Sequence, residues 1–197
     1  FNTSKVSDMS SMFCDCSGLT SLDLSHLDTR NVTNMSSMFS GCSGLTALDL
    51  SPLNTSKVSN MSSMFSRCSG LTSLDLASMD TGKVTNMSSM FRGCSSLTNL
   101  DFSLLDTQKV TDMGYMFCDC SSLTALNLTY MNTQKVTEMV WIFKDCSKLI
   151  NLSLGEKFAF VGSNYYLSEG TWYASDGTTY TSNEKSCTIP NNKADTY

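Results

Sequence analysis

Apolar residues recur with a fixed period of 26 residues over the first three quarters of the chain. The Met12-Phe13 pair returns as Met38-Phe39, Met64-Phe65, Met90-Phe91 and Met116-Phe117, and then as Ile142-Phe143. A single unit of this length cannot bury its apolar face alone, whereas stacked units form a continuous core. Phe1 aligns with Leu27, so the chain starts inside a repeat, and we expect it to be a piece of a longer protein.

Two hydrophobic periods coexist within each unit. The alternation of apolar and polar positions in residues 48–50 predicts a short strand with one buried face. The three-residue spacing of Val58, Met61 and Met64 predicts a short helix. Each unit is therefore expected to run strand, turn, helix, turn. Equivalent positions of successive units should then form rows, with neighbours about 4.8 Å apart.

The unit resembles the BspA-like leucine-rich repeats of bacterial surface proteins. The resemblance is carried by C-S-G-L-T-A-L-D-L-S at residues 42–51, T-S-K-V at 55–58 and N-M-S-S-M-F at 60–65. It implies a right-handed solenoid, secretion, and adhesion or host-ligand binding. The expected fold class is α/β: a right-handed leucine-rich-repeat solenoid with a parallel sheet on one face, short helices on the other and a C-terminal β-hairpin cap.

Periodicity ends after Leu154, which predicts a solenoid over residues 1–154 and a cap over 155–197. In the cap, aromatic and Thr residues flank Asp176-Gly177, a pattern typical of a β-hairpin. The row that holds Ser in the first four units becomes Tyr115 and then Trp141. We interpret this apolar bulk as a docking surface for the cap, and an aromatic platform for sugars remains the alternative.

Six of the nine cysteines share one row, which favours small buried side chains with free thiols. Cys14 and Cys118 each form a Cys-Asp-Cys triplet, and together these triplets resemble a zinc site. Four units separate them, so the row geometry excludes that site. Most of the 13 methionines fall in core rows, and a Met-rich groove for copper or a partner is the alternative.

The net charge of −5 and pI near 4.7 argue against nucleic acid as a partner. No apolar run approaches the length of a membrane span, and no cofactor or metal motif is present. His26 is the single histidine, and no catalytic arrangement can be assembled around it. We therefore expect a protein that is not an enzyme.

The exposed side chains of the predicted strands are the candidate ligand-binding site. One row is Asp23, Asp49, Asp75, Asp101 and Asn127, and beside it lie Ser21, Ser73 and Asn99. Each aspartate either bonds to its own turn or contributes to an acidic strip for a basic protein patch or calcium. A second row is mostly lysine, and we interpret it as paired locally with Asp28, Asp80 and Asp106, without a ligand.

These features favour an extracellular binding module on a bacterial cell surface. Adhesion to a host or matrix protein or to a glycan would use the concave sheet face. A structural spacer that projects another domain from the cell surface is the alternative, because a rigid regular array suits both functions.

Overall fold

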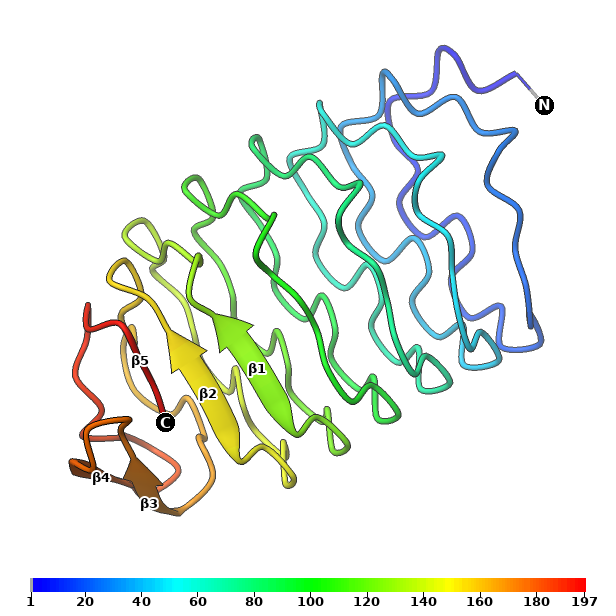
Figure 1. Ribbon diagram of the computed structural model, residues 1–197. Coiled ribbons are helices and arrows are strands. Elements are labelled where there is room, and N and C mark those ends of the chain that lie inside the picture. Colours follow the sequence, from blue (N-terminus) through cyan, green and yellow to red (C-terminus); the bar gives the residue numbers. More distant parts are fainter. Residues whose placement is uncertain (1) are drawn as a thin grey trace.

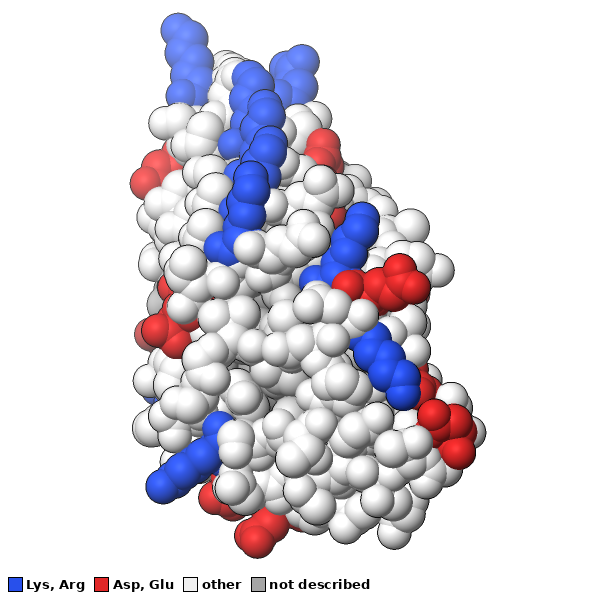
Figure 2. Space-filling model, turned by 90° about the vertical axis from the view of Figure 1, so that its left-hand side faces the viewer, with Lys and Arg blue, Asp and Glu red and all other residues white. Residues whose placement is uncertain are grey.

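The computed structural model describes residues 2–197 and shows a series of irregular coils that lie one behind another (Figure 1). Phe1, which the repeat aligns with Leu27, lies outside the described residues. Successive coils are joined at equivalent positions, as in the parallel bridges of Asn34 with Asn60 and of Asn60 with Asn86. The predicted alignment of rows is therefore confirmed. Most of the surface seen from the side of the cap is uncharged (Figure 2).

Residues 2–197 contain no helix and only a few short strands. The strands are β1 (Ala125–Leu128), β2 (Asn151–Leu154), β3 (Gly170–Tyr173), β4 (Thr179–Ser182) and β5 (Asp195–Thr196). The expectation of an α/β leucine-rich-repeat solenoid is wrong, because the repeated units consist mainly of non-regular backbone.

The predicted helices are replaced by tight turns. Ser63 and Arg67 have φ angles of 56° and 58°, in the left-handed region, and the equivalent residues of the other coils share this conformation. A right-handed helix cannot pass through such residues. The amide of Phe65 donates to the carbonyl of Met90 in the next coil, at 2.9 Å, instead of to its own segment. The three-residue spacing of apolar positions thus arises from consecutive turns that bury the same face.

The predicted strands keep their alternating burial, but regular pairing is found only at the C-terminal end of the described chain. There β1 pairs in parallel with β2, which places Leu126 opposite Leu152, and β5 pairs antiparallel with the far side of β2. The row at this position is acidic up to Asp101 and neutral from Asn127 onwards. Neighbouring carboxylates at coil spacing repel by about 1 kcal/mol in water, which opposes close pairing of the acidic coils.

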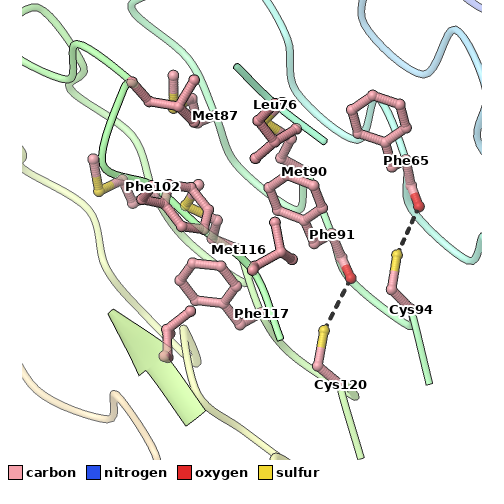
Figure 3. Close-up of a cluster of buried hydrophobic side chains, with 14 of the residues drawn as sticks. Phe65, Leu76, Met87, Met90, Phe91, Cys94, Phe102, Met116, Phe117 and Cys120 are labelled. Carbon is pink, nitrogen blue, oxygen red and sulfur yellow. Dashed lines mark hydrogen bonds between the residues drawn. The ribbon is translucent and has the colours of Figure 1, made fainter. Parts of the chain in front are cut away.

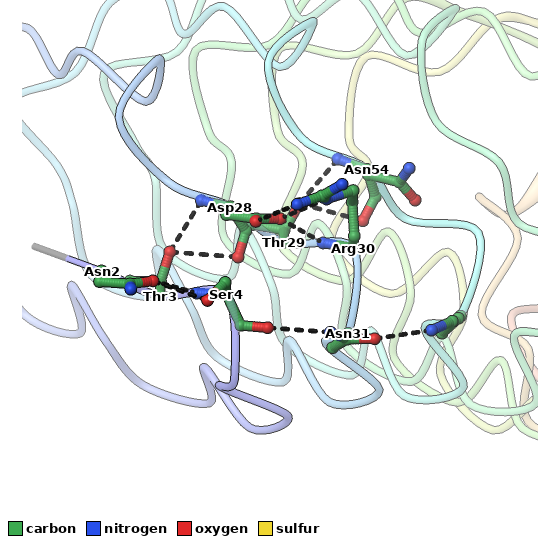
Figure 4. A network of polar contacts seen from close by, with 9 residues as sticks. Asn2, Thr3, Ser4, Asp28, Thr29, Arg30, Asn31 and Asn54 are labelled. Carbon is green, nitrogen blue, oxygen red and sulfur yellow. Dashed lines mark hydrogen bonds and ion pairs between the residues drawn. The ribbon is translucent and has the colours of Figure 1, made fainter.

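A row of buried threonines joins successive coils through their hydroxyl groups. Its members are Thr3, Thr29, Thr55, Thr81, Thr107 and Thr133. The hydroxyl of Thr29 donates to the carbonyl of Asn54 at 3.0 Å and accepts a hydrogen bond from the Asn54 amide at 2.7 Å (Figure 4). One side chain thereby satisfies both main-chain groups of a residue in the next coil.

The interior of the coils is made of rows of Met, Leu, Phe and Cys. The Phe39 and Phe65 rings stack with their centroids 5.7 Å apart. The Cys94 thiol donates to the carbonyl of Phe65 in the preceding coil, with a sulfur–oxygen distance of 3.1 Å (Figure 3). All nine cysteines are free, so the prediction of free thiols is confirmed.

The end cap contains the predicted hairpin. Strands β3 and β4 pair antiparallel around the turn at Asp176-Gly177. The start of the cap continues the coil pattern, because the Phe143 amide donates to the carbonyl of Tyr165 at 2.9 Å. Trp141 packs against Tyr166, with 5.8 Å between the ring centroids. The predicted docking of the cap beside the aromatic row is confirmed.

Candidate functional site

The predicted site residues all lie exposed on one face of the coils. They are Asp23, Asp49, Asp75, Asp101, Asn127, Ser21, Ser73 and Asn99. Asp49, Asp75 and Asp101 each stand between two buried apolar side chains, and Asp23 stands between the half-buried Leu22 and the buried Leu24. Core packing therefore forces the carboxylates outward, and we call this row the acidic face.

Each acidic-face aspartate accepts a hydrogen bond from the main chain of its own turn. Oδ1 of Asp49 accepts from the Ser51 amide at 2.9 Å, and Oδ1 of Asp101 accepts from the Ser103 amide at 2.8 Å. The backbone amide of Ser51 lowers the pKa of the Asp49 carboxyl, since it stabilises the charged form. The carboxylates thus have a structural role in the turns.

The second carboxylate oxygen is free to meet a ligand. In the described chain no hydrogen bond reaches Oδ2 of Asp49, Asp75 or Asp101. Asn127 makes the same turn contact through its amide oxygen, at 3.1 Å from the Thr129 amide. The turn therefore requires an oxygen acceptor, whereas the negative charge is not needed for it.

Four of the predicted residues line one shallow open hollow: Ser73, Asp75, Asn99 and Asp101. The side chain of Leu104 borders the same hollow and is 68% exposed. Tyr130, the next member of that row, is 65% exposed and lines a neighbouring hollow. Leu104 and Tyr130 were not selected from the sequence. Their row holds His26 and Pro52 in other coils, and His26 was considered only as a catalytic residue. Large apolar residues in an otherwise exposed row were the available signal.

The remaining chemistry-bearing residues do not converge. No group of three or more His, Cys, Asp or Glu suited to a metal ion occurs among the described residues. His26 lies on the surface, with its Nε2 3.9 Å from Oδ2 of Asp23. None of residues 2–197 belongs to a helix long and apolar enough to cross a membrane.

The sequence matches one family model, described as "Mycoplasma protein of unknown function, DUF285", over residues 1–74 and 69–160. The chain therefore belongs to this family. The assignment to the BspA-like leucine-rich repeats is wrong, because the match is to a different family whose description carries neither that fold nor an adhesin function. No curated protein and no solved structure matches the chain.

Proposed function

We propose that the chain is a binding module, and that it holds a protein partner against the acidic face. The observation that carries the proposal is the hollow at Asp75 and Asp101, where charged groups with a free carboxylate oxygen adjoin the exposed Leu104. An apolar side chain surrounded by polar groups is a typical anchor of a protein interface.

The chemistry of this face defines the partner that it fits. Ionised carboxylates in a row favour a basic patch, whose side chains relieve the repulsion between neighbouring aspartates. Leu104 and Tyr130 add apolar area at the C-terminal end of the same face. An open face suits a protein better than a small molecule, which prefers an enclosed cavity. Location outside a bacterial cell, with a host or matrix protein as partner, is part of the same proposal.

The test compares variants that remove charge but keep the turn contact. Asp49, Asp75 and Asp101 are changed together to Asn, since Asn127 shows that an amide oxygen accepts the same hydrogen bond. The control changes Asp8 and Asp112 to Asn in a different row, where the same kind of turn contact is made. Binding is measured by capture from serum and matrix extracts, followed by titration with the purified captured protein.

The proposal predicts that the triple variant loses capture and that Leu104→Ser weakens it about tenfold, while the control binds normally. Equal capture by the triple variant would place binding elsewhere. Absence of capture by the unchanged protein would favour the spacer. Protease added to intact cells tests the proposed location, because it should degrade the protein only if the protein lies outside the cell.

A further inference from the structure

A row of exposed lysines lies at a corner of the coils that is separate from the acidic face. Its basic members are Lys5, Lys57, Lys83, Lys109 and Lys135, with Asn31 in the remaining place. Each follows a buried threonine by two residues and directly precedes a valine, which is buried in every case except the half-buried Val6, so core packing fixes its outward direction. We call these residues the lysine row. Figure 2 shows a continuous file of basic side chains with no acidic side chain within it.

The lysine row is not neutralised by the protein. The expected pairing with Asp28, Asp80 and Asp106 is wrong, because within residues 2–197 no ion pair includes a member of the row. Asp28 pairs instead with Arg30, with 2.7 Å between the charged atoms. Oδ1 of Asp80 and of Asp106 accepts a main-chain hydrogen bond of its own turn. Among the described residues, the only side-chain hydrogen bond from a lysine of the row joins Lys57 Nζ to Asn31 Oδ1, at 2.7 Å.

The spacing of the charges is set by the main chain beside them. The amide of Thr85 donates to the carbonyl of Ser59 in the preceding coil at 2.8 Å, and Thr111 repeats this contact with Thr85. Adjacent lysines are thus held about one parallel-strand spacing apart, near 4.8 Å. Like charges at this distance repel one another, and a linear polyanion laid along the row would relieve that repulsion.

Apart from Arg30, which is paired with Asp28, neutral groups border the charges on both sides. One neighbouring row carries exposed hydroxyls, among them Thr85, Thr111 and Thr137, and the other carries Gln108 and Gln134 in its last coils. Neither of these rows nor the lysine row contains an aromatic residue. Single-stranded nucleic acids bind through base stacking on aromatic side chains, which these three rows lack. A sugar polymer needs no stacking and offers hydroxyls to the flanking rows, and one extended sugar unit has about the length of one coil spacing.

We propose that the lysine row binds a linear acidic polysaccharide that carries sulfate or carboxylate groups. The ammonium groups would contact the acidic groups of successive sugars, while the Thr and Gln rows would hydrogen-bond the sugar hydroxyls. This site is independent of the acidic face and does not depend on the partner proposed for it.

The proposal is tested with two triple variants of equal charge change. The first changes Lys83, Lys109 and Lys135 to Gln within the row. The control changes Lys148, Lys157 and Lys185 to Gln, which are exposed lysines outside it. Binding to heparin, desulfated heparin, hyaluronan and single-stranded DNA is measured by titration calorimetry over a range of salt concentrations.

We expect the unchanged protein and the control to bind an acidic polysaccharide with an affinity that falls as salt rises. The row variant should lose about tenfold or more, as expected for three surface ion pairs. Preference for heparin over its desulfated form identifies sulfate as the recognised group, and binding to hyaluronan identifies carboxylate. Failure to bind any of these polysaccharides, equal losses in both variants, or tighter binding of single-stranded DNA would overturn the proposal.

Discussion

Thr107 provides the sharpest test of how the coils are held together. Its side chain is 2% exposed, its hydroxyl donates to the carbonyl of Asn132 at 3.0 Å, and the Asn132 amide donates to it at 2.8 Å. Thr107→Val preserves the shape of the side chain but leaves both main-chain groups of the buried Asn132 without a partner. Each unsatisfied group costs about 1–3 kcal/mol, so the variant should lose about 2–6 kcal/mol of unfolding free energy.

Thr107→Ser keeps the hydroxyl and removes only a methyl group. Its expected loss is about 1 kcal/mol, the value of a buried methylene-sized group. Thr111→Val is the surface control, because the Thr111 amide still donates to the Thr85 carbonyl that the lost hydroxyl contacted. This control should stay within about 0.5 kcal/mol of the unchanged protein.

Thermal and urea unfolding, followed by circular dichroism, measure these differences. For a chain of this size the loss at Thr107→Val corresponds to a fall of roughly 4–24 °C in Tm. A hydrophobic account of the Thr row predicts the opposite order, with Val more stable than Ser. Observation of that order would refute the hydrogen-bonding role of the row.

Three further predictions concern single positions. Gly155→Ala should destabilise the protein by at least about 2 kcal/mol in urea unfolding, because a Cβ there would overlap the Thr129 carbonyl oxygen, whereas Gly18→Ala, with open space around it, should not. Burial raises the pKa of the Cys68 thiol to about 12, so iodoacetamide at pH 8 should label the half-buried Cys16 well before Cys68, and equal rates measured by mass spectrometry would contradict the buried row. The guanidinium of Arg30 lowers the pKa of Asp28 from 3.8 to about 2, so the stabilising contribution of the ionised Asp28 is present above about pH 4 and is lost as the pH falls towards 2. Asp28→Asn should therefore make the melting temperature depend less on pH over that range. An unchanged pH dependence in this variant would refute the stabilising role of Asp28.

The positions that are buried could be predicted from the sequence, but the backbone that buries them could not. Val58, Met61 and Met64 are all fully buried, as the repeat pattern indicates. The spacing of these residues is shared by a helix and by consecutive turns with left-handed residues, so it cannot separate the two. The deciding feature is the left-handed conformation at Ser63 and Arg67. Neither serine nor arginine favours this conformation as glycine does. Gly41 and Gly93, in the same row as Arg67, were the available signal.

The candidate site shows a similar division. Exposure of Asp75 and Asp101 follows from the alternation with leucine or phenylalanine, and the row geometry places them side by side. The apolar border formed by Leu104 has no repeat partner in the earlier coils, so periodicity gave no reason to select it. The lysine row was visible in the sequence, but its lack of ion pairs depends on side-chain positions that the pattern does not define.

Nuclear magnetic resonance couplings across hydrogen bonds test the stacked-coil structure most directly. In isotope-labelled protein, the amides of Met61, Ser63 and Phe65 should couple to the carbonyls of Asn86, Ser88 and Met90 in the next coil. Couplings from these amides to carbonyls four residues earlier in their own segment would indicate helices and would contradict the structure described above.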